Sequence, residues 1–246
     1  MLKFLQRGAD AVAQIKQADA LQEAKKAQQD APWRYWLKVG GSGRITFLDG
    51  DLAEDGTSLS PVSYWEHDLK MGGKFGNKYA CTQLTEPCPI CEGGVDQPSL
   101  VLAFTILDHV PYTSKAKGTL FENAKKLFIC KRETFKYLEK IAVKRGGLTG
   151  CTFDVDRTGD KSPNVGSHFD FIEKNVLPVL LGKYHPKDGV EPFDYNKALG
   201  YRDAAELRKL GFGIKSPLGH SDMPSAAPTV APWEDDTSIE EMSQKL

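Results

Sequence analysis

The sequence predicts a mainly β protein with some helix, an α+β fold in which a metal-binding loop interrupts the strands. Between residues 33 and 173, short alternating or continuous apolar segments are separated by turn residues, which is typical of strands. A group of His, Cys and Gly residues at 67–94 lies among them, and a segment with helical periodicity follows at 133–145. Strands, a metal loop and one helix between strands together indicate a small barrel.

Length and composition favour one core with a tail at each end. A chain of 246 residues can bury one good core, which we expect at 31–212. Apolar residues recur at three- and four-residue steps in 1–30, which predicts an amphipathic helical arm. Residues 213–246 combine a linker rich in Ser, Pro, Ala and Gly with an acidic end, which predicts a flexible tail.

Cysteine usage and the first residues indicate a soluble intracellular protein. The five cysteines are odd in number and three belong to the metal loop, so a disulfide framework is not expected. The chain contains no run of eighteen apolar residues, and its start lacks a signal-peptide core. A reducing, cytosolic compartment is therefore expected.

The first predicted elements are a hairpin and a third strand. In 33–39, Trp33, Tyr35, Leu37 and Val39 alternate with the cationic and aromatic residues Arg34, Trp36 and Lys38, so we expect the first four to face the core. After a Gly-rich turn, 44–48 is expected to return beside this strand. Residues 64–70 predict a strand that leads into the metal loop.

The remaining elements are predicted by apolar runs and by helical periodicity. Residues 100–107 form the most apolar run, which indicates a buried central strand, whereas 178–195 is expected to be irregular. The other predictions are strands at 125–132, 151–157 and 168–173, with the last two forming a hairpin, and helices at 133–145 and 196–210.

One histidine and three cysteines have the spacing of a metal site. Thirteen residues separate His67 from Cys81, and six separate Cys81 from Cys88. Cys88 and Cys91 form a Cys-x-x-Cys turn that can chelate one ion. A complete Cys3His set leaves no position for water, so one structural Zn²⁺ ion is predicted rather than a catalytic one.

Two alternatives apply to this cluster. The Cys-x-x-Cys turn could be a redox pair, but Glu92-Gly93-Gly94 does not begin the helix that such a motif requires. His109 and His168 compete with His67 for the fourth ligand position, because folding could bring either of them near.

Charge and aromatic residues favour a single-stranded nucleic acid as partner. The net charge is only -1, yet ten basic residues face three acidic ones between 112 and 150, whereas six acids face one lysine from 221 onward. A basic centre predicts a polyanion, and single strands need cations for phosphates and exposed rings for stacked bases. The predicted DNA contacts are Arg34, Trp36, Lys38, Arg44, Tyr112, Lys115, Lys117, Lys125, Lys126, Lys131 and Arg132.

Several motifs occur in an order that points to a known family. They are the strand and Gly-rich turn at 33–48, then His67, Tyr79-Ala80-Cys81 and Cys88-Pro89-Ile90-Cys91, then 126–141 and 151–153. In this order, over roughly residues 1–175, the chain resembles the single-stranded DNA-binding proteins of T-even bacteriophages.

The resemblance implies an OB-fold five-stranded barrel with an inserted zinc subdomain, and His67, Cys81, Cys88 and Cys91 as its metal ligands. It further implies that the arm 1–30 self-associates along DNA and that the acidic end recruits replication and recombination proteins. The protein would coat single-stranded DNA during phage replication, recombination and repair, in the cytoplasm of the infected bacterial host.

Three other functions fit parts of the sequence. A zinc-containing RNA-binding or transcription-associated module would use the same stacking and phosphate chemistry. A metal-dependent nuclease could use Asp108-His109 or His168-Phe169-Asp170, but no HExxH, Walker loop or carboxylate set for two metals occurs, so an enzyme is not expected. An interaction scaffold would show no salt-dependent DNA binding.

Overall fold

The structure, a computed structural model, describes residues 33–69, 77–113 and 120–213, together with six positions between 8 and 19. The chain divides into two units, Met1–Gly213 and Ile214–Leu246. Apart from Gly213, the predicted tail lies outside the described residues, as does most of the predicted arm. Within the arm, Ala9, Val12 and Ile15 are helical, as the periodicity predicts at these positions.

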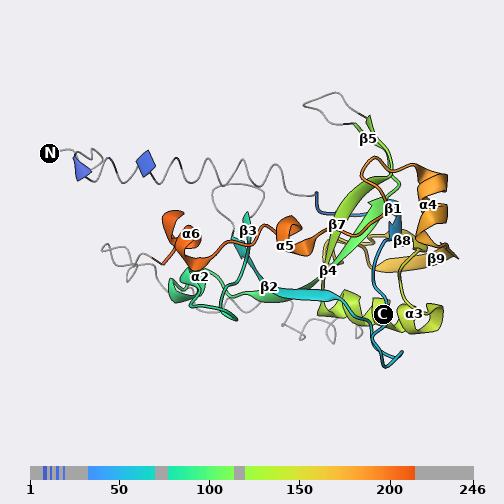
Figure 1. Cartoon of the computed structure of the whole chain (residues 1–246), viewed down its shortest axis with the longest axis horizontal. Helices are drawn as coiled ribbons and strands as arrows, with labels where there is room; N and C mark the ends of the chain where they lie inside the picture. The colour runs from blue at the N-terminus through green and yellow to red at the C-terminus, as the bar shows by residue number, and fades with distance from the viewer. Residues whose placement is uncertain are drawn as a thin grey trace, which may run out of the picture. The chain divides into compact units, whose positions relative to one another are not determined.

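One seven-stranded antiparallel sheet forms the body of the first unit (Figure 1). Its order is β3-β2-β4-β1-β8-β9, and β7 pairs with β4. A separate hairpin consists of β5 (Tyr112–Thr113) and β6 (Leu120–Phe121). The α+β class with an antiparallel sheet is therefore confirmed. The strands of the sheet are β1 (Ser42–Phe47), β2 (Val62–Leu69), β3 (Asn77–Ala80), β4 (Ser99–Asp108), β7 (Ala124–Lys131), β8 (Cys151–Asp156) and β9 (His168–Lys174).

Strand β4 is the centre of the sheet. Its first half pairs with β2, with Val62 opposite Ala103, and its end pairs with β1, with Phe47 opposite Ile106. Because β7 pairs along nearly all of β4, it must occupy the other edge. Residues 101–108 are all buried, so the predicted central strand is confirmed. The predicted last hairpin is also confirmed, as β8 and β9 pair antiparallel.

The main core lies between one face of the sheet and α3 (Arg132–Arg145), the helix predicted at 133–145. Leu138 and Ala142 are fully buried on its inner side, and Gly146 ends it with a left-handed φ of 66°. Figure 1 shows α3 along one side of the strands. The core aromatic rings are those of Tyr35, Phe47, Phe104, Phe128, Phe153 and Phe169.

The opposite face of the sheet is covered by α4 (Leu177–Tyr184), a helix in a segment that was expected to be irregular. Leu180 packs there against Leu48 and Leu107, which alternate with the core residues Phe47 and Ile106. That expectation was wrong because Pro178 stands in the first turn of the helix, where a missing N–H costs nothing.

The single helix expected at 196–210 is also wrong. The structure has two short helices there, α5 (Tyr195–Ala198) and α6 (Ala204–Lys209). Gly200 adopts a positive φ of 60° between them. Asp203 then starts α6, because its side chain accepts a hydrogen bond from the backbone N–H of Glu206.

The predicted first hairpin is wrong, because residues 33–39 do not pair with 44–48. The edges of β1 are taken by β4 and β8, which are longer or more apolar partners. The segment lies beside β7 instead, where the backbone N–H of Tyr35 donates to Leu127 and that of Leu127 donates to Trp33. Tyr35 and Leu37 are buried as expected, but Trp33 and Val39 are exposed.

No closed barrel is found among the strands of the described residues. The path ends at β9 on one side and at β3 and β7 on the other. The five-stranded barrel is therefore not observed, and an antiparallel sheet of seven strands stands in its place.

Candidate metal centre and nucleic-acid interface

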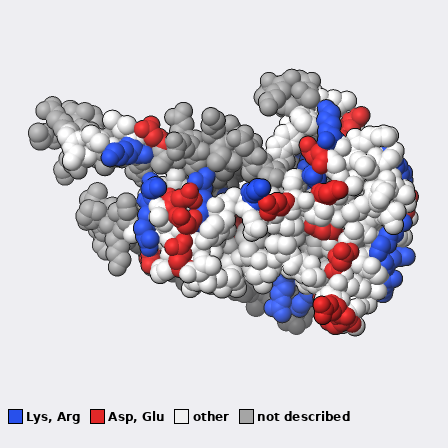
Figure 2. Space-filling view, viewed as in Figure 1, with Lys and Arg blue, Asp and Glu red and all other residues white. Residues whose placement is uncertain are grey.

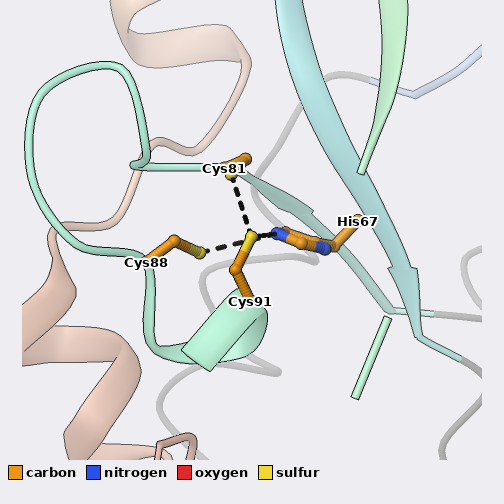
Figure 3. Close-up of side chains that lie close together, drawn as sticks. All are labelled: His67, Cys81, Cys88 and Cys91. Carbon is orange, nitrogen blue, oxygen red and sulfur yellow. Dashed lines mark hydrogen bonds between the residues drawn. The ribbon is translucent and has the colours of Figure 1, made fainter. Parts of the chain in front are cut away.

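Four predicted metal ligands converge at one end of the sheet (Figure 3). His67 projects from β2, and Cys81 follows β3, which pairs with β2. Cys88 and Cys91 flank and enter α2 (Pro89–Glu92), a single turn with proline at its start. The hairpin β2-β3 and the turn before α2 thus bring residues separated by up to 24 positions to one point.

Three of the six distances between the ligand atoms match the edges of a tetrahedral metal site. His67 Nε2 lies 3.5 Å from Cys88 Sγ and 3.5 Å from Cys91 Sγ, and Cys81 Sγ lies 3.7 Å from Cys91 Sγ. With bonds of about 2.3 Å to sulfur and about 2.0 Å to nitrogen, a tetrahedron has edges of about 3.8 Å between sulfurs and about 3.5 Å from nitrogen to sulfur. All four ligand atoms lie within 4.8 Å of one another, so this donor set fits a metal ion such as zinc.

The thiols differ in how readily they ionise. Burial opposes ionisation of Cys88, yet backbone N–H groups, that of Cys91 foremost, hold its pKa at about 6. Burial, together with the neighbouring thiols of Cys81 and Cys88, raises the pKa of Cys91 to about 12. A divalent cation would favour all three thiolates, because its charge offsets their mutual repulsion.

An apolar shell packs against the cluster and buries two of its four ligands, while Cys81 and Cys91 are partly exposed. His67 is fully buried and Cys88 nearly so. The shell also ties the cluster to α6, since the backbone N–H of Ala204 donates to Glu86 Oε1 at 2.7 Å. A metal ion held here by all four protein ligands would have no open position for water or substrate. The shell consists of Leu69, Tyr79, Ile90, Leu207, Leu210 and Phe212.

Two arginines predicted to contact DNA form ion pairs within the fold. The guanidinium of Arg34 donates to both carboxylate oxygens of Glu66, at 2.9 and 2.6 Å, and Glu66 is 6% exposed. This pair ties the segment 33–39 to the strand that carries His67. Arg44 donates to the Asp154 carboxylate at 2.7 and 2.9 Å on the surface of the sheet.

Two lysines predicted to contact DNA also have partners within the fold. Lys126 Nζ lies 2.6 Å from Asp108 Oδ2, and both side chains are largely buried. Lys125 Nζ donates to the backbone carbonyls of Asp188 and Glu191 at 2.7 and 3.1 Å. Sequence reasoning missed these partners because they lie far along the chain.

The other predicted contacts remain accessible or lie outside the described residues. Lys38, Lys131 and Arg132 are exposed and form no ion pair with another described residue. Trp36 is 53% exposed, as predicted from its cationic neighbours. Lys115 and Lys117 lie outside the described residues.

Three aromatic rings form a surface group that the sequence only partly indicated, with Trp33 and Tyr112 exposed and Phe121 half-buried. The rings of Trp33 and Tyr112 lie 5.5 Å apart and nearly perpendicular, and those of Trp33 and Phe121 lie 5.0 Å apart. Trp33 is 43% exposed and Tyr112 45%. Lys187 Nζ lies 5.9 Å from the Phe121 ring centre. The alternating pattern had predicted that Trp33 faces the core. The one signal against this was Pro32, which indicates that Trp33 comes before the sheet begins.

A cleft of about 930 Å³ beside Arg44 is not suited to DNA. It is lined by more carboxylates than cations, because Asp154, Asp156, Asp170 and Glu173 outnumber Arg44 and Lys183. Acidic and basic side chains are interspersed on the face in Figure 2. Repulsion of phosphates makes this cleft a poor nucleic-acid site.

The residues proposed for a nuclease have structural partners. Asp108 is paired with Lys126, and the His109 ring contacts Thr46 and Asn123 at 2.7 Å. His168 and Asp170 form an exposed pair at 3.1 Å. Within the described part of the chain, the Cys3His cluster is the one group of three or more potential metal ligands.

In the described part of the chain, every helix is too short or too polar to cross a membrane. The sequence matches no known family model, and a search of curated proteins finds no match. The resemblance to the T-even phage proteins therefore rests on the motifs in the sequence.

Proposed function

We propose that this protein binds single-stranded DNA without reading its sequence and coats transient single strands during phage DNA replication, recombination and repair. The observation that carries the proposal is the surface aromatic group of Trp33, Tyr112 and Phe121, in which Trp33 and Tyr112 are exposed. Aromatic rings at a surface provide platforms on which bases of any identity can stack, and each stacked base contributes about 1–3 kcal/mol.

The charge around these rings supports the same partner. Tyr112 and Phe121 come from the two strands of the β5-β6 hairpin, and the sequence between them contains Lys115 and Lys117 but no acid. Lys187 lies over the Phe121 ring. Cations next to stacking rings can contact the phosphates that link the bases.

The metal in this proposal is one structural Zn²⁺ ion, bound by His67, Cys81, Cys88 and Cys91. Its support is the convergence of the four ligand atoms within 4.8 Å of one another and the apolar residues packed against them. The ion would fix the β2-β3 hairpin and the turn before α2 and would take no part in a reaction. In this proposal the protein is not an enzyme.

The proposed architecture is a variant of the OB fold. Segment 33–37 lies between β7 and the loop that joins β8 to β9, because Tyr35 N–H donates to Leu127 and Leu37 N–H donates to Asn164 at 2.7 Å. It therefore lies where a strand that closes a barrel would run. This support is geometric, and the pairing is too short to form a strand.

The proposed protein partners follow from charge and resemblance. The arm 1–30 would contact the next copy of the protein along the DNA, and the acidic end would recruit replication and recombination proteins. Both segments lie mainly outside the described residues, so the support comes from the sequence. The place of action would be the cytoplasm of the infected bacterial host.

A matched pair of substitutions tests base stacking. Tyr112→Ala should weaken binding to oligo(dT) about 5- to 150-fold, the equivalent of one stacked base. Tyr201→Ala is the control, since Tyr201 is 49% exposed and lies outside the aromatic group. Titrations monitored by tryptophan fluorescence measure both. Equal affinities for the two variants would contradict the proposal, and tighter binding to matched RNA would favour the RNA-binding alternative.

The salt dependence tests the phosphate contacts. Nine cations were predicted to contact DNA, and four of them are held within the fold, which leaves five. With a slope of about -0.7 per neutralised phosphate, log affinity against log salt should fall with a slope of about -3.5 rather than about -6. No salt dependence, or equal binding of duplex DNA, would refute single-strand binding.

A further inference from the structure

The buried ring of His67 has one nitrogen that the metal centre does not use. Its Nε2 faces the thiols of Cys88 and Cys91 (Figure 3). Nδ1 is buried on the other side of the ring and has no hydrogen bond to any described residue. A neutral imidazole carries one proton, so a ring that binds a metal through Nε2 must carry that proton on Nδ1. A buried N–H of this kind requires an acceptor.

A carboxylate lies next to this nitrogen. Asp96 Oδ2 is 3.4 Å from His67 Nδ1, a few tenths of an ångström beyond an ordinary hydrogen bond. The same oxygen accepts the backbone N–H of Asp68 at 3.1 Å. The backbone of β2 therefore holds the carboxylate beside the ring that the same strand carries.

The acidic residues of β2 itself, Glu66 and Asp68, have other partners. Glu66 accepts two hydrogen bonds from Arg34. The Asp68 carboxylate lies 2.7 Å from Lys78 Nζ and is more than half exposed. Asp96 is only 30% exposed and comes from the segment between α2 and β4. The Asp96 carboxylate is thus placed to accept a hydrogen bond from the His67 ring.

We propose that Asp96 is a positioning residue of the metal centre. Its carboxylate accepts a hydrogen bond from the Nδ1–H group of His67 and so holds Nε2 toward the three thiols. Such an acceptor fixes the tautomer and the ring orientation and increases the basicity of the ligating nitrogen. Asp96 does not touch the metal itself. The inference rests on the metal proposed for this centre and does not depend on DNA binding.

The first experiment measures zinc affinity by competition with a chromophoric chelator in the full-length protein. Asp96→Ala should weaken zinc binding about 10- to 100-fold, and Asp96→Asn should weaken it less, because an amide oxygen still accepts a hydrogen bond. Asp68→Asn is the matched control. It also removes one carboxylate beside His67, but this carboxylate faces Lys78, and affinity should stay within about twofold of the wild type.

Two further readouts separate positioning from folding. The Co²⁺-loaded Asp96→Ala protein should keep the absorption bands of a tetrahedral Cys3His site, which shows that all four ligands still bind. In zinc-loaded wild type, the ¹⁵N–¹H signal of His67 Nδ1 should exchange slowly with solvent, and in Asp96→Ala it should exchange at least tenfold faster or vanish.

The outcomes are distinct. Unchanged zinc affinity in Asp96→Ala, or an equal loss in Asp68→Asn, would overturn the role of Asp96 and leave the metal centre and DNA binding intact. A wild-type protein that binds no zinc would overturn the metal centre and this inference together. Loss of the Cys3His cobalt bands in Asp96→Ala would mean that the residue supports the fold of the loop, which also contradicts the proposal.

Discussion

Substituting Leu207 tests whether the metal centre and α6 stabilise each other. Leu207 is fully buried in the apolar shell of the cluster, together with Cys88 and Ile90. Truncating a fully buried leucine to alanine costs about 2–5 kcal/mol. A helix of six residues does not persist alone, so a loss of this size should detach α6. Cys88 would then lose its apolar cover.

The size of the effect on metal binding follows from linkage. If docking of α6 and binding of the metal are coupled by about 1–3 kcal/mol, Leu207→Ala should weaken zinc binding about 5- to 150-fold. Competition with a chelator measures this directly. By the same reciprocity, removing zinc from the wild type should expose 199–213 to a protease, and adding zinc back should protect it.

Leu180→Ala is the control for Leu207→Ala. Leu180 is also fully buried, but it lies on α4 in a separate apolar group with Leu48 and Leu107. Its loss should lower the free energy of unfolding by a similar amount and leave zinc affinity unchanged. The coupling is refuted if zinc affinity is equal in Leu207→Ala and the wild type, or if Leu180→Ala weakens zinc binding as much.

Three further predictions concern the sheet and the tail. Burial raises the pKa of Asp49 to about 6 against its ordinary 3.8, so the native state binds this proton more tightly. Up to about 3 kcal/mol of the free energy of unfolding, present below pH 4, should therefore be lost by pH 7. Urea unfolding of the wild type and of Asp49→Asn at several pH values measures this loss. A difference between the two free energies that does not change with pH would contradict it. Glu66→Gln should lower the free energy of unfolding by about 1–3 kcal/mol because Arg34 loses its partner, whereas a change below about 0.5 kcal/mol in chemical unfolding would count against that role. Deleting residues 233–246 should tighten single-stranded DNA binding at low salt, since the acidic end can occupy the basic surface, and unchanged affinity would argue against this competition.

The metal ligands could be predicted because their chemistry is local. His67, Cys81, Cys88 and Cys91 lie within one short stretch, and few other arrangements explain three thiols and an imidazole so close together. The shell around them could not be predicted in the same way. Leu207, Leu210 and Phe212 resemble the apolar face of any short helix, and only folding brings them to the cluster.

The first hairpin shows where local patterns fail. Residues 33–39 and 44–48 both alternate and are joined by a Gly-rich turn, which predicts a hairpin. However, β8 offers β1 a partner with Phe153 and Val155 fully buried, and the backbone of Arg157 bonds to Gly40 and Gly41 at the turn itself. A distant strand thus displaced the adjacent one, and periodicity carries no information about such competition.

Composition indicated that the central segment is basic, but not which of its basic side chains are free of partners within the fold. Arg34 meets Glu66 across 32 positions and Arg44 meets Asp154 across 110, and neither pairing could be inferred from spacing. Cations with internal partners cannot neutralise phosphates unless those bonds break, and for Arg34 this would leave the buried Glu66 carboxylate unpaired. In the proposed function, base stacking on the rings of Trp33, Tyr112 and Phe121 therefore contributes more to DNA binding than the paired cations on the sheet. A base can stack on the exposed rings of Trp33 and Tyr112 without breaking an ion pair, so in the proposed function their contribution is retained in the folded protein.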